Sequence, residues 1–228
     1  MEINIAYLYY DLLNLYGENG NILSLKKHIE SQDIKVNIYY LSLNDKKDFS
    51  KYDLVYIGSG TDNNLLIALN DLKNYKDEIK KYIENNKFIL STGNSLELFG
   101  NYIFKDNKKI NTLGVLDYYT SYKENRIVKD VLYNCKINKN KIIGFENHRG
   151  FITNNLDYFL SDKNIKEGIM YKGFIGTYVL GPILIRNPYF TEHYIKTIIN
   201  TKYNKFKFKK FNFNLEKEAY KKATELFK

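Results

Sequence analysis

Asp53-Leu-Val-Tyr-Ile-Gly-Ser-Gly-Thr-Asp62 contains a short apolar run that ends in a glycine-rich polar turn. A second run of this kind, Lys87-Phe-Ile-Leu-Ser-Thr-Gly93, follows a stretch from about 64 to 84 with apolar residues at helical spacing. Short apolar runs closed by turn residues are typical of buried strands, and a helix between two of them is typical of a crossover connection. The segment therefore predicts two parallel strands joined by a helix, with both turns at the same edge of a sheet.

The chain before this segment continues the alternation. Residues 3–9 and 36–41 are strand-like, and residues 21–31 between them carry apolar side chains at helical spacing. After the second run, a short helix over 95–99 is expected to end at Gly100. Strands that alternate with helices predict an α/β protein with a mainly parallel sheet and helices on both faces.

The second half of the chain is richer in strands. Four strand-like runs lie there, at residues 113–119, 126–131, 141–145 and 174–180. Asn214 is a candidate N-cap for a C-terminal helix over about 214–227, whose apolar residues form one stripe. Because no linker or repeat interrupts the chain, we expect residues 1–228 to form a single domain.

The composition limits the class of protein. The chain has 228 residues, 44% of them hydrophobic, which is enough for a core. It has no apolar run long enough to span a membrane, and its N-terminus lacks the basic region of a signal peptide. Cys135 is the single cysteine, so neither an intramolecular disulfide nor a multi-cysteine metal site is expected. These features predict a cytoplasmic protein without a bound metal.

The formal net charge of +9 raises the alternative of a nucleic-acid-binding module. The dense basic and aromatic stretch is Lys205-Phe-Lys-Phe-Lys-Lys-Phe211, and single-strand binders interleave rings and cations in this way. An alternating edge strand or loop with solvated lysines explains the same pattern. Lysine is also abundant throughout the chain, so we favour the second interpretation and do not expect a nucleic-acid partner.

Five blocks match one family in order. They are Tyr9-Tyr-Asp-Leu-Leu-Asn-Leu-Tyr-Gly-Glu-Asn-Gly-Asn21, Gly58-Ser-Gly-Thr-Asp62, Leu113-Gly-Val-Leu-Asp-Tyr-Tyr-Thr120, Gly144-Phe-Glu-Asn-His-Arg-Gly150 and Gly176-Thr-Tyr-Val-Leu-Gly-Pro182. Over roughly residues 5–195 the chain thus resembles the amidotransferase subunit of lipid II isoglutaminyl synthase (GatD type), among class I amidotransferases similar to cobyric acid synthase. The resemblance implies a flavodoxin-like class I glutamine amidotransferase fold.

The resemblance also implies an activity and a partner. In this family the subunit hydrolyses glutamine and passes ammonia to a Mur-ligase-like partner (MurT type). The partner uses ATP to activate a glutamate carboxylate of the peptidoglycan precursor, which becomes the isoglutamine amide. ATP and magnesium therefore belong to the partner, and no cofactor is expected in this chain.

Two motif positions depart from the family pattern. The family has Cys-Gly-Gly-Tyr-Gln at the elbow after the fourth strand, and alignment from Gly100 places Gly93 at the cysteine. The later motif Gly-Thr-Tyr-Leu-His-Gly-Pro has Leu180 in place of the histidine. Glycine cannot form a thioester, and leucine can neither take up nor return a proton. We therefore expect a glutaminase-dead pseudoenzyme.

An altered hydrolase is the alternative enzyme hypothesis. Thr92 or Ser95 would be its nucleophile, and His148 is the one histidine expected near the edge that carries the turns. A hydroxyl is a poor nucleophile without an adjacent base. His28 and His193 are expected at the surface, and Cys135 is interpreted as a bystander thiol in a loop.

A binding pocket can outlast the lost catalytic pair. Arg126 matches a family arginine implicated in recruiting glutamine, so a small carboxylate such as glutamine is a candidate ligand. Glu97, an acid where the family has an amide, is expected to change the local charge, while Asn94 and Ser95 replace glycines and would partly fill the pocket. The residues predicted for a residual pocket are Gly58, Gly60, Asn94, Ser95, Glu97, Arg126 and His148.

Overall fold

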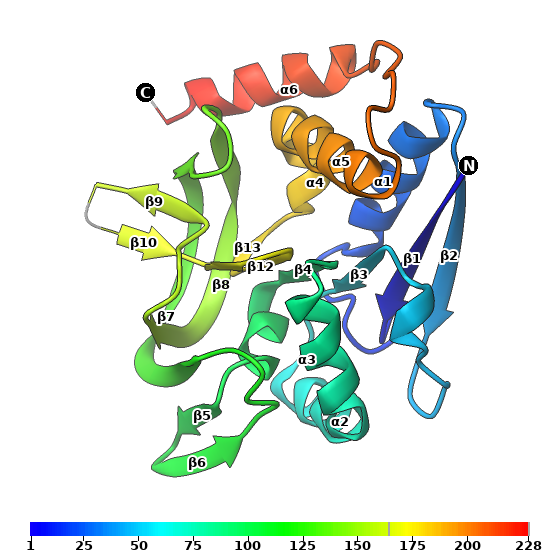
Figure 1. Ribbon diagram of the computed structural model, residues 1–228. Helices are drawn as coiled ribbons and strands as arrows, with labels where there is room; N and C mark the ends of the chain where they lie inside the picture. The colour runs from blue at the N-terminus through cyan, green and yellow to red at the C-terminus, as the bar shows by residue number, and fades with distance from the viewer. Residues whose placement is uncertain (164, 228) are drawn as a thin grey trace.

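The computed structural model describes residues 1–163 and 165–227 and contains two sheets (Figure 1). The first has six strands in the order β11-β12-β4-β3-β1-β2. All neighbours pair in parallel except the edge strand β11, which is antiparallel to β12. The predicted mainly parallel sheet is therefore confirmed. Its strands are β1 (Glu2–Leu8), β2 (Lys35–Leu41), β3 (Leu54–Ile57), β4 (Phe88–Thr92), β11 (Ile169–Tyr171) and β12 (Phe174–Thr177).

Helices cover both faces of this sheet (Figure 1). Helices α1 (Asn19–Glu30) and α5 (Pro188–Lys202) lie on one face, and α2 (Asp62–Leu72) and α3 (Lys76–Glu84) lie on the other. Successive side chains of a strand point to opposite faces, so β1 supplies Ile3, Ile5 and Tyr7 to the first core and Ala6 and Leu8 to the second. Burial on both faces explains why the central strands are apolar almost throughout.

Two helical predictions need correction. The stretch predicted as one helix over 64–84 is divided into α2 and α3 by a 3-10 turn, η2 (Lys73–Tyr75). Tyr75 leaves the helical conformation, with φ of −113°, and Asp77 and Glu78 then start α3 with negative charges near its N-terminus. The helix predicted over 95–99 is a 3-10 helix, η3 (Gly93–Leu98), that begins directly at the end of β4.

The second sheet is built around a long antiparallel ribbon, β7 (Tyr118–Cys135) and β8 (Lys141–Asn154). The runs predicted at 126–131 and 141–145 are therefore parts of longer strands, and Cys135 lies in a strand rather than a loop. The strand predicted at 113–119 forms only from Tyr118, because the N–H groups of residues 113–116 donate to the carbonyls of residues 98–100. The remaining strands of this sheet are β5 (Tyr102–Lys105), β6 (Lys108–Asn111), β9 (Leu160–Asp162), β10 (Ile165–Glu167) and the short β13 (Val179–Leu180).

The two sheets meet where the chain passes from β12 to β13 (Val179–Leu180). β12 pairs with β4 in the first sheet, whereas β13 pairs with β8 in the second. The strand predicted over 174–180 is thus broken at Tyr178. This break brings Leu180 next to the end of β4. The short helix α4 (Ile183–Arg186) follows and leads into α5.

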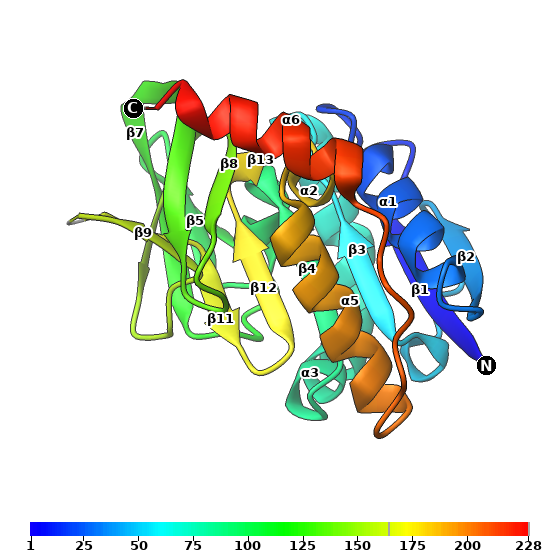
Figure 2. The same cartoon turned by 90° about the horizontal axis from the view of Figure 1, so that it is seen from above.

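The basic and aromatic stretch forms an irregular strap between α5 and α6 (Asn214–Glu225), alongside α5 in Figure 2. Phe206 and Phe208 pack against the core and Phe211 is buried, whereas the lysines between them are exposed. The rings that a nucleic-acid interface would need are thus turned inward. His28, predicted at the surface, is instead buried and stacked on Phe213 at 3.8 Å between ring centroids.

The C-terminal helix ends slightly earlier than the predicted 214–227. Asn214 is its first helical residue and Phe213 occupies the N-cap position, so the predicted cap is wrong. The predicted apolar stripe is largely unburied, since no α6 residue is buried and Leu215 is 77% exposed. His193 lies at the surface on α5, as expected.

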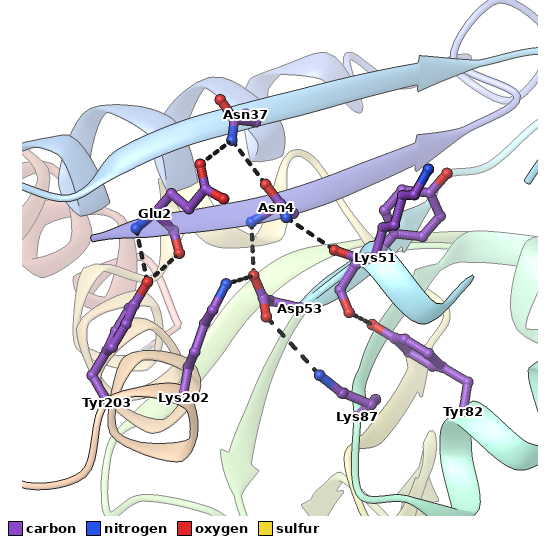
Figure 3. Close-up of polar contacts among 10 residues, drawn as sticks. Glu2, Asn4, Asn37, Lys51, Asp53, Tyr82, Lys87, Lys202 and Tyr203 are labelled. Atoms are coloured by element: carbon purple, nitrogen blue, oxygen red, sulfur yellow. Dashed lines mark hydrogen bonds and ion pairs between the residues drawn. The ribbon is translucent and has the colours of Figure 1, made fainter. Parts of the chain in front are cut away.

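Side chains at the amino ends of β1 and β3 form a closed polar network (Figure 3). Asp53 Oδ2 accepts hydrogen bonds from the Asn4 N–H at 2.8 Å and from Lys202 Nζ at 2.7 Å. The Tyr203 hydroxyl donates to the Glu2 carbonyl at 2.6 Å. The network therefore fastens the end of α5 to the sheet. Within the described residues, no helix is both long and apolar enough to cross a membrane.

Candidate functional site

The elbow between β4 and η3 is the centre of the site. Gly93 there has φ of +64°, a left-handed conformation that favours glycine. A Cβ atom at this position would lie 2.5 Å from Ser59 Cβ and 2.8 Å from Leu180 Cδ2. Ordinary contacts of a Cβ are longer than 3.4 Å. The space for a side chain at residue 93 is thus already filled.

Leu180 closes the elbow from the side of the second sheet. Its side chain is buried, and β13 places it opposite Phe145 of β8. The two positions that depart from the family motifs, 93 and 180, are therefore neighbours in space although they are far apart in the chain. Neither residue lines the cavity that opens beside the elbow.

Asn94 ties the elbow to the glycine-rich turn after β3. Its Oδ1 accepts hydrogen bonds from the Gly60 N–H and the Ser59 hydroxyl, both at 3.1 Å, and its Nδ2 donates to the Gly60 carbonyl at 2.8 Å. A backbone N–H at such a turn could otherwise stabilise a developing oxyanion. Here that donor is occupied by a side chain of the same protein.

The hydroxyls of Thr92 and Ser95 face the interior. Thr92 Oγ1 donates to Glu18 Oε2 at 2.9 Å. Ser95 Oγ lies 2.7 Å from Ser91 Oγ and within hydrogen-bond distance of the Ile57 and Thr92 carbonyls. Both side chains are fully buried, and neither lines the cavity. The predicted alternative nucleophiles therefore do not face the cavity.

Glu18 forms a buried polar cluster beneath the elbow. Its carboxylate accepts hydrogen bonds from the hydroxyls of Tyr56 and Thr92, from Asn21 Nδ2 and from the Ser59 N–H. Burial raises the pKa of Glu18 above its ordinary value, although these four hydrogen bonds oppose the shift. The cluster fixes the glycine-rich turn and β4 relative to one another.

A cavity of about 410 Å³ opens beside the elbow at the carboxyl ends of β3 and β4. Five of the seven residues predicted for a residual pocket line it: Gly60, Asn94, Glu97, Arg126 and His148. Gly58 and Ser95 do not, which corrects that prediction. A Cβ at Gly58 would strike Leu13 and Glu18, so Gly58 serves close packing beneath the turn.

Two arginines give the cavity a positive wall. Arg126 lies in a bulge of β7, where residues 123–126 stand opposite Arg149 alone. Neither guanidinium takes part in an ion pair with the residues that the structure describes, and Arg149 Nε donates to the Lys123 carbonyl at 3.0 Å. By contrast, the Asp62 carboxylate in the cavity wall is paired with Lys105. The arrangement suits a ligand that carries a carboxylate.

Glu97 is buried in the cavity wall. Its two oxygens accept hydrogen bonds at 3.0 Å from the hydroxyls of Tyr122 and Tyr178. Burial raises the pKa of Glu97 to about 8. The carboxyl group is therefore mostly protonated at pH 7 and uncharged, like the amide of the family pattern. At this pKa Glu97 adds little charge to the cavity wall at pH 7, in contrast to the expected change of local charge.

His148 stacks on Tyr178, with ring centroids 3.9 Å apart. Its Nδ1 lies 2.8 Å from the Gly150 carbonyl. A carbonyl oxygen can only accept, so Nδ1 carries the proton in the neutral ring. His148 is thus held by its neighbours rather than placed as a base beside Thr92 or Ser95, whose hydroxyls have their own partners.

Several site residues were not predicted. Arg149, Asn147 and Tyr122 line the cavity, and Glu18 supports it from below. Arg149 and Asn147 flank His148 in the chain, so their block pointed to them. Tyr122 pairs with Gly150 just before the bulge of β7, and only the folded chain shows that its hydroxyl donates to Glu97.

The chain is similar to known proteins of one family over most of its length. The sequence profile of the CobB/CobQ-like glutamine amidotransferase domain matches residues 4–188. The chain is similar to the "lipid II isoglutaminyl synthase (glutamine-hydrolyzing) subunit GatD" of Streptococcus pneumoniae, with 34% identity over 220 residues that cover 89% of this chain and 82% of that protein. It is similar to the GatD subunit of Staphylococcus aureus at 32% identity over 204 residues, covering 86% of this chain and 84% of that protein.

Solved structures are more distant in sequence. One crystal structure of a glutamine amidotransferase superposes with a TM-score of 0.55 at 11% identity, covering 85% of this chain and 98% of that chain. A glutamine amidotransferase from Thermotoga maritima gives a TM-score of 0.53 at 11% identity, covering 98% of this chain and 90% of that chain. At such identity the similarity shows a shared fold.

Proposed function

This chain belongs to the CobB/CobQ-like glutamine amidotransferase family, and from that premise we propose that it is a non-hydrolytic subunit of a lipid II isoglutaminyl synthase. In this proposal it binds a Mur-ligase-like partner (MurT type) in the cytoplasm and supports amidation of the glutamate of the peptidoglycan precursor. The partner supplies the ATP and magnesium chemistry. Ammonia reaches the partner from solution or from another amide donor.

The observation that carries the proposal is the sealed elbow. The nucleophile position holds a glycine whose side-chain space is filled by Ser59 and Leu180. The adjacent N–H of Gly60 is bonded to Asn94. Loss of the thiol, the base and the free oxyanion donor would each remove much of the acceleration of such a reaction, and together they leave no route through a thioester.

The first experiment separates the two nitrogen sources. The chain is purified with its ligase partner, and lipid II amidation is measured with glutamine alone or with ammonium chloride alone. We expect product only with ammonium chloride, and no ammonia release when the complex is incubated with glutamine. Glutamine-dependent product, or a partner that is equally active without this chain, would contradict the proposal.

A second experiment rebuilds the site in steps. A Cys135→Ala background removes the native thiol, and Gly93→Cys with Leu180→His then restores the two family residues. We expect this variant to remain inactive and slow to react with iodoacetamide, because Ser59 still occupies the space around residue 93. Adding Ser59→Gly and Asn94→Gly opens that space and frees the Gly60 N–H, so thiol labelling should accelerate at least about tenfold.

The rate of iodoacetamide labelling shows whether the cysteine introduced at position 93 is accessible, even in a variant that does not hydrolyse glutamine. Circular dichroism and thermal melting of each variant show whether it is folded. Hydrolysis of glutamine by the variant with Gly93→Cys and Leu180→His alone would show that Ser59 and Asn94 do not prevent the reaction.

The cavity can still serve binding. The unpaired guanidinium of Arg126 and that of Arg149 face a space of about 410 Å³, which is large enough for a small amino acid. We propose that this wall binds glutamine or another small carboxylate without cleaving it. Calorimetry with glutamine, glutamate and glutaminol tests it. Glutaminol lacks the carboxylate and should bind at least about tenfold more weakly, and Arg126→Ala should remove the difference.

A further inference from the structure

A second cavity, of about 390 Å³, lies between the β7–β8 ribbon and the β9–β10 hairpin. Strand β8 contributes residues to this cavity and to the one at the elbow. Glu146, His148, Ile152 and Asn154, which share one face of the strand, line the second cavity, whereas Asn147 and Arg149 of the opposite face line only the first. His148 is the residue that touches both. The proposed amidotransferase role makes no use of this second space.

The polar groups left free in this cavity are hydrogen-bond acceptors. His148 is 8% exposed, and its Nε2 has no hydrogen-bond partner in the described structure. With the proton on Nδ1, the neutral ring presents a lone pair at Nε2. Nε2 lies 4.0 Å from Glu146 Oε2, too far for a direct hydrogen bond but suitable for a third group between them. The Asn154 amide oxygen also lacks a partner within the described part of the chain.

Glu146 adds a negative charge at the base of the cavity. The residue is 2% exposed, and Oε1 accepts a hydrogen bond from the Tyr133 hydroxyl at 2.9 Å. The other oxygen, Oε2, accepts no hydrogen bond from the described residues and has the Lys129 ammonium group 3.6 Å away.

The other polar groups in the lining are already engaged. Glu167 accepts the Tyr178 N–H at 2.6 Å and the Thr177 hydroxyl at 2.8 Å, and burial raises its pKa to about 8, so it adds little charge. The Tyr178 hydroxyl donates to Glu97, and Asp157 pairs with Lys136. Lys166 lies over the Tyr158 ring at 5.1 Å. Glu146 Oε2, His148 Nε2 and the Asn154 amide oxygen are thus the acceptors that remain for a ligand.

We propose that this cavity binds a protonated primary amine, with its ammonium group between Glu146 Oε2 and His148 Nε2 and its carbon chain against the apolar wall. An ammonium group has three donors and no acceptor, which matches a set of free acceptors. Ile127, Phe151, Ile152, Leu156 and Ile165 provide the apolar wall.

Lys129 already places one ammonium group of the chain itself near the Glu146 carboxylate. Its ammonium group lies 3.6 Å from Glu146 Oε2, while its side chain is 44% exposed at the cavity mouth. The Lys129 ammonium group competes with a free amine for the carboxylate. It also repels the free amine, because both are positively charged. Removal of Lys129 is therefore expected to strengthen binding, whereas removal of the Glu146 charge is expected to abolish it.

Titration of the intact chain at pH 8 and constant ionic strength tests the proposal. The probes are the chloride salts of n-butylammonium, ammonium and tetramethylammonium, followed by calorimetry and by amide shifts in NMR spectra. We expect n-butylammonium to bind, and tetramethylammonium, which has no N–H donor, to bind at least about tenfold more weakly. If ammonium binds as tightly as n-butylammonium, free ammonium is identified as the ligand. If ammonium binds more weakly, the ligand is an organic amine.

Three variants complete the test. Glu146→Gln should lower the affinity for n-butylammonium at least about tenfold, and Lys129→Ala should raise it about threefold at low salt. Asp157→Asn, which removes a charge already paired at the mouth, should leave it within about twofold. Thermal melting establishes that each variant is folded. Equal binding of tetramethylammonium, or weaker binding by Lys129→Ala, would overturn the proposal even if Glu146→Gln failed to fold.

Discussion

The two edges of the parallel sheet use polar side chains in opposite ways. At the amino edge, Asp53 is 7% exposed, and its carboxylate bonds to a backbone N–H and to Lys202, with Lys87 4.0 Å away (Figure 3). At the carboxyl edge, Arg126 and Arg149 face a cavity without an ion-pair partner among the described residues. The carboxylate at the first edge is thus paired within the chain, whereas the two guanidinium groups at the second edge have no carboxylate partner among the described residues.

The difference shows which edge has a structural role and which remains available for a ligand. Polar groups that bind one another hold elements together, and their loss lowers stability. Polar groups that line a space without partners contribute little to stability and remain free to bind. Gly93 and Leu180 stand at the closed elbow of the carboxyl edge, and an open cavity lies beside them, so the proposal above assigns binding to this edge.

The largest expected effect is at the elbow, which is closed although it lies on the open edge. Gly93→Ala places a Cβ against Ser59 in a left-handed conformation and should lower the free energy of unfolding by about 3 kcal/mol. Urea denaturation measures the change. In a Ser59→Gly background, Gly93→Ala should lower the free energy of unfolding by at least about 1 kcal/mol less than it does in the native background. If the effects of the two substitutions simply add, the contact between Ser59 and the Cβ at residue 93 is disproved.

A smaller loss is expected at the closed amino edge. Asp53→Ala leaves the Asn4 N–H and Lys202 without their acceptor, so the free energy of unfolding should fall by about 2 kcal/mol. The matched control is Asp130→Ala, at an exposed position of β7, with an expected change below about 0.5 kcal/mol. Equal effects of the two substitutions would remove the distinction between the edges.

Glu97→Gln should change the pH dependence of stability. Burial raises the pKa of Glu97 from 4.5 to about 8, so between these values the folded chain holds a proton that the unfolded chain has lost. Stability therefore decreases as the pH rises from 4.5 to 8 and is constant above. Glutamine has no such loss, but its amide must also be desolvated, so we expect a gain of about 1 kcal/mol at pH 8 and none at pH 5. Urea denaturation at both pH values gives the comparison, and a gain of equal size at pH 5 would exclude titration of Glu97 as its cause.

The smallest effect on stability is expected for Arg126→Ala on the open edge. The exposed guanidinium has no partner among the described residues, so the free energy of unfolding should change by less than about 0.5 kcal/mol. Binding of a small carboxylate should nevertheless decrease. A loss of stability comparable to that of Asp53→Ala would show that the arginine is structural.

The parallel sheet was predictable because its strands are buried on both faces and therefore apolar throughout. The elbow was predictable because β4 ends in a polar turn followed by a glycine. The long ribbon was only partly predicted, since β7 and β8 owe their length to pairing with each other rather than to local pattern. His28 was misplaced because its burial depends on Phe213, which is distant in the chain.

The amino-acid sequence by itself determined the family, the alternation of strands and helices, and the absence of cysteine and histidine from the two motifs. These features depend on residue identity and on local periodicity. The tertiary structure alone decided that Ser59 and Leu180 fill the space at Gly93, that Asn94 occupies the Gly60 N–H, and that burial raises the pKa of Glu97. Each of these depends on distances between segments far apart in the chain and on burial, which residue order alone does not specify.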